Sequence, residues 1–265
     1  MSLLIIGCGN MGGAMLSGWL ACGMNPATIT VVDPFRPDVP AGVTLLRELP
    51  ENGHFDTILL GIKPQQLAEA APAISRLAPI QTSILSVLAG VDLATLHKAF
   101  PDAGGIVRIM PNLAAALGKS PIAVAGDVPF SYRVEIEHLL GPLGKVEWIE
   151  DEALMDLMTA LVGSGPAFVY RVIEALAQGA EKLGLPRDQA DRLALAMVDG
   201  AVALAASSPD SPAELARKVS SPGGTTVAGL SALDENAALA ALLEETLRRA
   251  RDRGRELAEA ARNAG

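Results

Sequence analysis

The chain has 265 residues, of which 50% are hydrophobic and 3% aromatic, and its formal net charge at pH 7 is −9. This length allows two domains, and the aliphatic composition favours closely packed helices. The acidic balance, without a basic cluster, argues against nucleic acid or an anionic membrane surface as a partner. Cys8 and Cys22 form no Cys-x-x-Cys pair, and no uninterrupted apolar run reaches about 18 residues, so we expect a cytoplasmic protein that does not span a membrane.

The strongest local signal lies at the N-terminus. The apolar run 3–6 leads directly into Gly7-Cys8-Gly9-Asn10-Met11-Gly12, and a helix-like stretch follows at 13–21. In a strand–turn–helix of this kind Gly7 permits the tight turn, Gly9 leaves room for a pyrophosphate, and Gly12 lets the helix pack close to the strand. The unpaired N–H groups at the start of the helix would then face the phosphates.

An acidic residue follows at the expected spacing. A second strand-like run, 28–32, ends in Asp33, which lies 21 positions after Gly12. A carboxylate about 20 residues after the glycine turn is typical of the group that binds a ribose hydroxyl in dinucleotide sites. The alternative is a glycine-rich turn without a ligand and an aspartate that only caps a strand. The order of strand, turn, helix and acid favours the nucleotide site.

Strand-like and helix-like segments alternate over residues 1–150, which predicts a Rossmann-type α/β domain with a mostly parallel sheet. Ligands of such sheets lie beyond the carboxyl ends of the strands, so the residues that follow each strand are the candidates for a cofactor site. Besides the two strands above, we expect strands at 56–62, 82–88, 105–109, 120–125 and 145–149, and helices at 65–77, 93–100 and 133–140.

Residues 151–265 contain no strand-like segment and predict an all-helical second domain. On the last expected helix, Leu239, Leu242, Leu243, Leu247 and Ala250 would form one apolar stripe. Such a stripe needs a cover, and a second copy of the chain is the natural one, so we expect a homodimer or a larger homo-oligomer. The expected helices span 153–162, 166–183, 187–206, 213–219, 225–233 and 235–262.

Two turns interrupt this helical half. The first is Gly-Ser-Gly-Pro at 163–166, and the second is Ser-Ser-Pro-Gly-Gly-Thr-Thr at 220–226. Each places free N–H groups and hydroxyls at a helix start, which suits a carboxylate or a phosphate. The alternative is that both are ordinary helix breaks with serine or threonine caps.

The distribution of acid–base residues bears on the chemistry. The helical half has no histidine, no lysine occurs between Lys145 and Lys182, and no His, Cys, Asp or Glu group has metal-ligand spacing, so we expect no metal. Reduction of a ketone needs a proton donor near the alkoxide, whereas a protonated imine already carries its positive charge. The pattern therefore favours reduction of a C=N bond without establishing it.

The chain resembles the pyrroline-5-carboxylate reductase family, which catalyses the last step of proline biosynthesis, over nearly its full length. The resemblance implies a Rossmann domain followed by a helical dimerisation domain, with dimers that often form rings, commonly decamers. It also implies that NADPH or NADH reduces 1-pyrroline-5-carboxylate to L-proline. The matching segments occur in order at 6–12 (IGCGNMG), 61–65 (GIKPQ), 88–91 (LAGV), 108–112 (RIMPN), 163–167 (GSGPA) and 219–230 (VSSPGGTTVAGL), the last being the most specific.

By that resemblance, the residues that follow the strands bind the cofactor, and Asn112 bounds the cleft near the reacting ring. The implied residues are Ile6, Gly7, Cys8, Gly9, Asn10 and Met11 around the pyrophosphate with Gly12 behind them, Gly61, Ile62, Lys63 and Pro64 after the third strand, and Val87, Leu88 and Ala89 near the nicotinamide.

The same resemblance places the substrate on the 220–226 turn. Backbone N–H groups of Gly224, Thr225 and Thr226 would bind its carboxylate, next to Gly223. Ser221 would shape the turn and contact the carboxylate, and the Thr226 hydroxyl would hydrogen-bond the ring nitrogen and relay its proton. Ser221 and Thr226 are therefore the expected catalytic residues, and catalysis would consist mainly of orientation and electrostatics.

Two positions depart from the family pattern. Val162 precedes Gly163 where the family often has serine, which removes a hydroxyl from the first turn. Asp33 stands where many relatives have a small hydroxyl residue that tolerates the 2′-phosphate of NADPH. A carboxylate there favours NADH, although Arg36 would partly offset it, so both cofactors stay open.

Two other functions fit parts of the pattern. β-Hydroxyacid dehydrogenases share the overall layout, but their lysine on a glycine-rich helix, followed one turn later by asparagine, is absent here. A dinucleotide-sensing protein without catalysis is the second alternative, and the 220–226 turn is the feature that argues against it.

Overall fold

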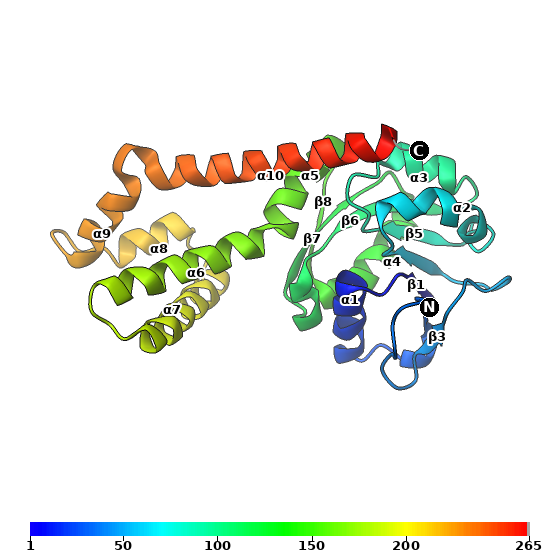
Figure 1. Ribbon diagram of the computed structural model, residues 1–265, viewed down its shortest axis with the longest axis horizontal. Helices are drawn as coiled ribbons and strands as arrows, with labels where there is room; N and C mark the ends of the chain where they lie inside the picture. The colour runs from blue at the N-terminus through cyan, green and yellow to red at the C-terminus, as the bar shows by residue number, and fades with distance from the viewer. Residues whose placement is uncertain (264–265) are drawn as a thin grey trace. The chain divides into compact units, whose positions relative to one another are not determined.

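The computed structural model describes residues 1–263, and the chain divides into two compact units (Figure 1). The first unit comprises Met1–Ser164 together with the chain from Arg249 onward, and the second comprises Gly165–Arg248. The predicted boundary at residue 150 between a dinucleotide-binding and a substrate-binding domain stays a prediction.

The first unit is built on an eight-stranded sheet in the order β3-β2-β1-β4-β5-β6-β7-β8. Neighbouring strands run parallel except β6 and β7, so the predicted Rossmann-type, mostly parallel sheet is confirmed. The strands are β1 (Leu3–Ile6), β2 (Ile29–Val32), β3 (Thr44–Leu46), β4 (Thr57–Leu60), β5 (Ser83–Ser86), β6 (Gly105–Met110), β7 (Ser120–Ala125) and β8 (Gly144–Trp148).

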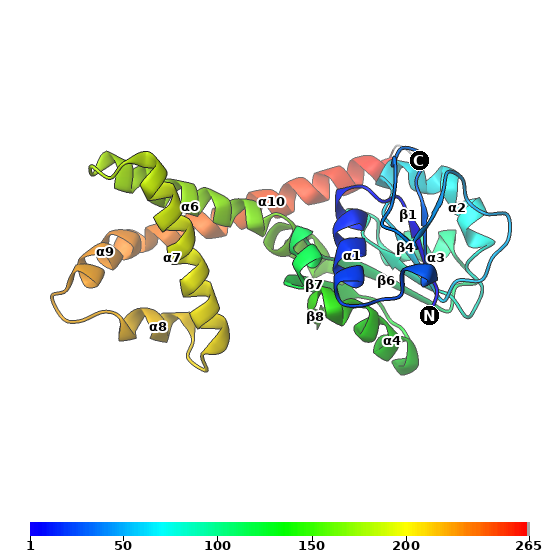
Figure 2. The same ribbon diagram turned by 90° about the horizontal axis from the view of Figure 1, so that it is seen from below.

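Helices cover both faces of this sheet (Figures 1 and 2). One face carries α1 (Asn10–Ala21) and α4 (Phe130–Leu140), and the other carries α2 (Leu67–Ser75) and α3 (Leu93–Ala99). Short 3₁₀ segments lie at Pro26–Thr28, Pro64–Gln66, Leu113–Leu117, Gly141–Leu143, Glu152–Leu154 and, in the second unit, Glu235–Ala237.

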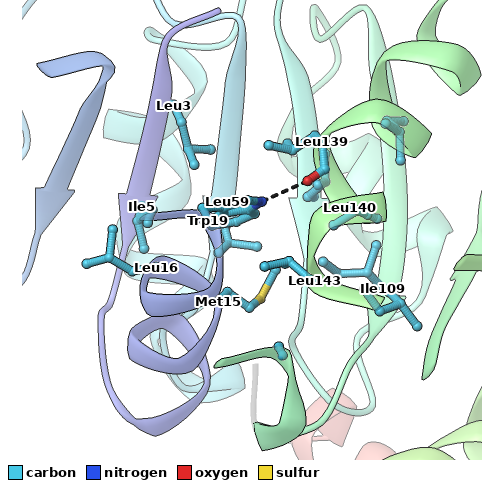
Figure 3. Packing of buried hydrophobic residues seen from close by; sticks show 14 of the residues in the cluster. Leu3, Ile5, Met15, Leu16, Trp19, Leu59, Ile109, Leu139, Leu140 and Leu143 are labelled. Atoms are coloured by element: carbon cyan, nitrogen blue, oxygen red, sulfur yellow. Dashed lines mark hydrogen bonds between the residues drawn. The ribbon is translucent and has the colours of Figure 1, made fainter. Parts of the chain in front are cut away.

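Two aliphatic cores follow from the alternation of side chains along the strands. Leu3 and Ile5 of β1 point to the α1 and α4 face, whereas Leu4 and Ile6 point to the α2 and α3 face. All four side chains are at most 4% exposed, as expected for a strand buried on both faces. In the first core, shown in Figure 3, the Trp19 Nε1–H donates a hydrogen bond of 2.7 Å to the Leu139 carbonyl and joins α1 to α4.

A partly buried ion pair joins β6 to the start of the helical segment that follows β8. The side chain of Arg108 on β6 is 8% exposed, and its Nη1 lies 2.8 Å from Glu152 Oε1. The same oxygen accepts a 2.7 Å hydrogen bond from the Leu93 N–H at the start of α3. The Glu152 carboxylate therefore connects β6 and α3 to the segment that precedes α5 (Met155–Met158). A π-helical turn (Thr159–Gly163) follows α5.

The second unit is all-helical, as predicted. Its elements are α6 (Gly165–Lys182), α7 (Arg187–Ser207), α8 (Pro212–Lys218), α9 (Thr225–Asp234) and the first part of α10 (Ala238–Asn263), whose last part belongs to the first unit. Small side chains, among them Ala177, Ala190 and Ala194, form the contact between α6 and α7. Many larger side chains of the unit face outward, including Tyr170 at 67%, Leu193 at 54% and Leu242 at 63% exposure.

By length and composition alone, two helical stretches within residues 1–263 are apolar enough to cross a membrane, Glu152–Lys182 and Thr225–Glu259, and the bent pair Arg187–Ser207 and Pro212–Lys218 would be a third if it formed one span. They contain most of the exposed apolar side chains just described. The expectation that no membrane is a partner, based on uninterrupted apolar runs, stays a prediction.

Candidate functional site

The turn between β1 and α1 has the backbone that a phosphate-binding loop requires. Gly7 has φ of +84°, and a Cβ there would lie 2.7 Å from the Gly61 carbonyl carbon, so only glycine fits between the ends of β1 and β4. A Cβ on Gly12 would lie 2.7 Å from the Gly7 oxygen, which is the close packing expected of the third glycine. Gly9, in contrast, faces open space, as the approach of a ligand demands.

The start of α1 is free to receive an anion. Gly9 is its N-cap, and no side chain caps it. The first-turn N–H groups of a helix lack partners within the helix and carry the positive end of its dipole. Next to this turn lies a cavity of about 680 Å³, lined by Cys8, Gly9, Asn10, Gly13, Ala14, Ser17, Asp33, Phe35, Arg36, Pro37, Leu113 and Ala116. The backbone and the cavity fit a dinucleotide.

Asp33 lies at this cavity, but its carboxylate is held by the protein backbone. Oδ2 accepts from the Cys8 N–H at 2.8 Å, and Oδ1 accepts from the N–H groups of Phe35 and Arg36 at 2.9 and 3.0 Å. Burial alone would raise the pKa of Asp33, but these three hydrogen bonds and the charge of Arg36 lower it below its ordinary value. Asp33 is therefore a carboxylate that joins the phosphate turn to the loop after β2.

Cys8 contributes its backbone rather than its thiol. The side chain is 2% exposed, and burial raises the pKa of the thiol, with Arg36 opposing and Asp33 adding to that effect. A buried neutral thiol is a weak nucleophile, so the side chain acts as packing beneath the turn.

The other cofactor residues of the prediction lie at the carboxyl ends of β4 and β5. The Gly61 N–H donates to the Ile6 carbonyl at 2.7 Å and the Val87 N–H to the Leu60 carbonyl at 3.2 Å, so the ends of β1, β4 and β5 lie side by side. Lys63 is the N-cap of the 3₁₀ segment that follows β4, and its N–H donates to Gln66 Oε1 at 3.0 Å. Ile62, Pro64, Leu88 and Ala89 complete this edge of the sheet.

Asn112 is 6% exposed, and both ends of its amide have protein partners. Its Oδ1 accepts from the Ala114 N–H at 2.9 Å, and its Nδ2 donates to the Val162 carbonyl at 3.1 Å. Asn112 therefore connects the segment after β6 to the π-helical turn that ends at Gly163. Irregular turns of this kind are frequent at functional sites.

The 220–226 turn lies in the second unit and leads into α9. Gly224 is the N-cap of α9, no side chain caps the helix, and the Gly224 N–H donates to the Ser221 carbonyl at 2.9 Å. A Cβ on Gly224 would lie 2.5 Å from Ser221 Oγ and 3.0 Å from the Ser221 carbonyl oxygen, so Ser221 packs closely against this glycine. The N–H groups of Thr225 and Thr226 open the helix and have no partner within it. The turn can therefore receive a carboxylate at two or more N–H groups.

Several residues of the cofactor cavity were not predicted. Phe35 and Pro37 line it from the loop after β2, Leu113 and Ala116 from the 3₁₀ segment after β6, and Ser17 from α1. Ser17 lies two helical turns after Asn10, so helical spacing is the signal that identifies it. Among the residues that the structure describes, no group of three or more His, Cys, Asp or Glu side chains is placed to hold a metal ion.

Comparisons with known proteins connect these features to one family. The family described as pyrroline-5-carboxylate reductase dimerisation matches residues 152–257, and that described as NADP oxidoreductase, coenzyme F420-dependent, matches residues 2–90. The chain is 34% identical over 265 residues to the pyrroline-5-carboxylate reductase of Pseudomonas aeruginosa, with 97% of each chain covered.

Solved structures agree. The structure of a pyrroline-5-carboxylate reductase from Coxiella burnetii superimposes with a TM-score of 0.88 at 28% identity and covers 97% of this chain and 98% of its own. The crystal structure of Plasmodium falciparum pyrroline carboxylate reductase with NADP bound has a TM-score of 0.78 at 23% identity, covers 98% of both chains, and shares the fold.

Proposed function

The chain belongs to the pyrroline-5-carboxylate reductase family, and we propose that it reduces the C=N bond of 1-pyrroline-5-carboxylate to L-proline with NADPH or NADH. The observation that carries this function is the 34% identity to a named reductase over 97% of both chains. The phosphate turn of the first unit and the uncapped N-terminus of α9 in the second supply two separate anion sites, one for each reactant. The β-hydroxyacid dehydrogenase and the non-catalytic sensor lose their support, because the relatives are reductases over their full length.

The cofactor residues act by binding and orienting. Backbone N–H groups at the start of α1 bind the pyrophosphate, while Gly7 and Gly61 keep the loops after β1 and β4 close together. The ends of β4 and β5, with Lys63 and Val87 to Ala89, line the path toward the nicotinamide, and Asn112 supports the edge of the cleft. When bound, the reduced nicotinamide supplies the hydride that the imine carbon accepts.

The substrate-binding residues contact two groups of the imino acid, its carboxylate and its ring nitrogen. N–H groups of Thr225 and Thr226 hold the carboxylate at the start of α9, where the helix dipole favours an anion. The Gly224 N–H, also expected to bind it, already donates to the Ser221 carbonyl and therefore shapes the turn. Ser221 shapes the turn through its contact with Gly224, and Gly223 supplies the left-handed φ of +69° that the turn needs. The Thr226 hydroxyl hydrogen-bonds the ring nitrogen and passes to it a proton taken from solvent, so that the nitrogen is protonated when the imine carbon accepts the hydride.

Self-association covers the helical half. A dimer is supported by the family match over 152–257 and by the exposed apolar side chains of α6, α7 and α10. We propose that a second copy of the chain, rather than lipid, covers the two apolar helical stretches, and that dimers assemble further, as in a decamer. The two free cysteines support a cytoplasmic location.

A spectrophotometric assay tests the proposed function. The purified protein with 1-pyrroline-5-carboxylate should oxidise NADPH or NADH and form proline in equal amounts. Oxidation that proceeds without the imine, or no oxidation with either cofactor, contradicts it.

A further inference from the structure

The loop after β2, residues 33–38, is held in one conformation by Arg47. Its Nη1 donates to the carbonyls of Asp33 at 3.3 Å and Pro34 at 3.5 Å and to the carbonyl of Arg36, and its Nη2 donates to the Pro37 carbonyl at 3.3 Å. The N–H donors of Arg47 Nη1 and Nη2 are therefore occupied by carbonyl oxygens of this loop. This cation shapes the rim of the cofactor cavity and is not one of the residues that line it.

Arg36 is placed differently. Its Nη1 donates to the Cys8 carbonyl at 2.6 Å and its Nε to the Asp38 carbonyl at 3.0 Å, which lays the guanidinium against the phosphate turn. Nη1 also lies 3.2 Å from the position of a Cβ on Gly13, beside the face of α1 that carries Asn10 and Ser17. Within residues 1–263, Nη2 has no hydrogen-bond partner. The fixed end of this side chain leaves one edge of its guanidinium for a ligand.

Asp33 offers little to a ribose. A carboxylate has about four acceptor positions, and three backbone N–H groups already use the oxygens of Asp33. An acid at this point of the chain usually accepts hydrogen bonds from the 2′- and 3′-hydroxyls of the NADH ribose, and that would need two free acceptor positions on the carboxylate. The charge of the carboxylate is also balanced locally by Arg36. The advantage that a free Asp33 carboxylate would give NADH therefore loses its basis.

We propose that Arg36 determines cofactor specificity by binding the 2′-phosphate of NADPH, with Asn10 and Ser17 on the adjacent face of α1. This inference rests on the proposed function for the identity of the cofactor. A guanidinium presents paired N–H donors that match the oxygens of a phosphate monoester. The charge-assisted hydrogen bonds between Arg36 and a 2′-phosphate would take the place of the contacts that Asp33 cannot make to the ribose hydroxyls. The ligand class is therefore a ribose that carries a 2′-phosphate.

Binding of two adenosine nucleotides tests the proposal without catalysis. In calorimetric titrations of the full-length protein, adenosine 2′,5′-bisphosphate should bind on the order of tenfold more tightly than 5′-AMP. Arg36→Ala should remove most of this difference, and Arg36→Lys should keep part of it. Arg76→Ala, an exposed arginine on the opposite face of the sheet, is the matched control and should leave the difference unchanged.

The titrations separate recognition of the 2′-phosphate by Arg36 from a purely structural role of this side chain. If Arg36→Ala weakens both nucleotides equally, Arg36 supports the phosphate turn and does not recognise the 2′-phosphate, which overturns the proposal. A wild-type protein with equal affinity for both nucleotides overturns it as well. In steady-state kinetics, KM for NADPH should rise on the order of tenfold in Arg36→Ala while KM for NADH changes little. The nucleotide titrations do not need the imine, so a failed reductase assay leaves this inference separately testable.

Discussion

Replacing Glu152 by glutamine tests the ion pair that joins β6, α3 and the segment before α5. Glutamine keeps an oxygen for the Leu93 N–H but removes the charge opposite Arg108, whose side chain is 8% exposed. Loss of one partner of a buried pair costs about 3–5 kcal/mol of unfolding free energy. Because Glu152 itself is 30% exposed, water reaches the pair, and we expect a smaller loss than for a fully buried pair, about 2–3 kcal/mol. For a protein of this size that lowers Tm by roughly 5–10 °C.

The control is an ion pair of similar length at the surface. Arg253 and Glu256 lie 2.7 Å apart with side chains 65% and 63% exposed, so Glu256→Gln should cost less than about 0.5 kcal/mol. Thermal unfolding is measured for both variants at one fixed protein concentration, because association shifts Tm. A second variant, Glu152→Gln combined with Arg108→Leu, should recover part of the loss, since no buried cation remains. Equal Tm values for Glu152→Gln and Glu256→Gln would show that the Glu152–Arg108 pair stabilises the fold no more than a surface pair does.

Three further predictions concern the site and the assembly. Thr226→Ala should lower kcat on the order of 10²-fold in the reductase assay and Thr226→Ser should retain most activity; unchanged turnover in Thr226→Ala rejects the proton relay. In sedimentation at micromolar concentration no monomer should be present, and a single 27.4 kDa species contradicts the dimer. Asp33→Asn should lower the urea midpoint at pH 7, because the folded protein depresses the pKa of Asp33 and is therefore stabilised by the ionised carboxylate. This loss of stability should shrink as the pH falls below 3.8, the ordinary pKa, and through the lower pKa of the folded protein. A loss that does not depend on pH excludes the ionised carboxylate as its cause.

Much of the first unit is predictable because its signals are local. The strand at 3–6 and the turn of Gly7 to Gly12 are fixed by an apolar run and by glycines that the backbone needs, and the structure has both. The strand β3 (Thr44–Leu46) was not predicted, because three residues that are exposed or half-buried carry no periodic pattern. The antiparallel direction of β7 was not predicted either, since strand direction depends on pairing and not on local sequence.

The cofactor site shows where local reasoning ends. The spacing to Asp33 predicts a carboxylate near the phosphate turn, and the structure places it there. Its partners, however, are N–H groups of its own loop and of Cys8, and that loop is shaped by Arg47, which lies 14 positions away in the chain. Contacts of this kind exist only once β2 and β3 are paired. The role of Arg36 therefore follows from the folded loop and not from the spacing of motifs.

We propose above all that main-chain N–H groups at the start of α9 hold the carboxylate of a cyclic imino acid whose C=N carbon accepts a hydride from a bound, reduced nicotinamide. A crystal structure of the protein with NADPH and L-proline would show whether they do. The proline carboxylate should lie within hydrogen-bond distance of the Thr225 and Thr226 N–H groups, with the ring nitrogen at the Thr226 hydroxyl. Proline bound away from the start of α9, in a crystal where the dinucleotide is bound, would contradict it.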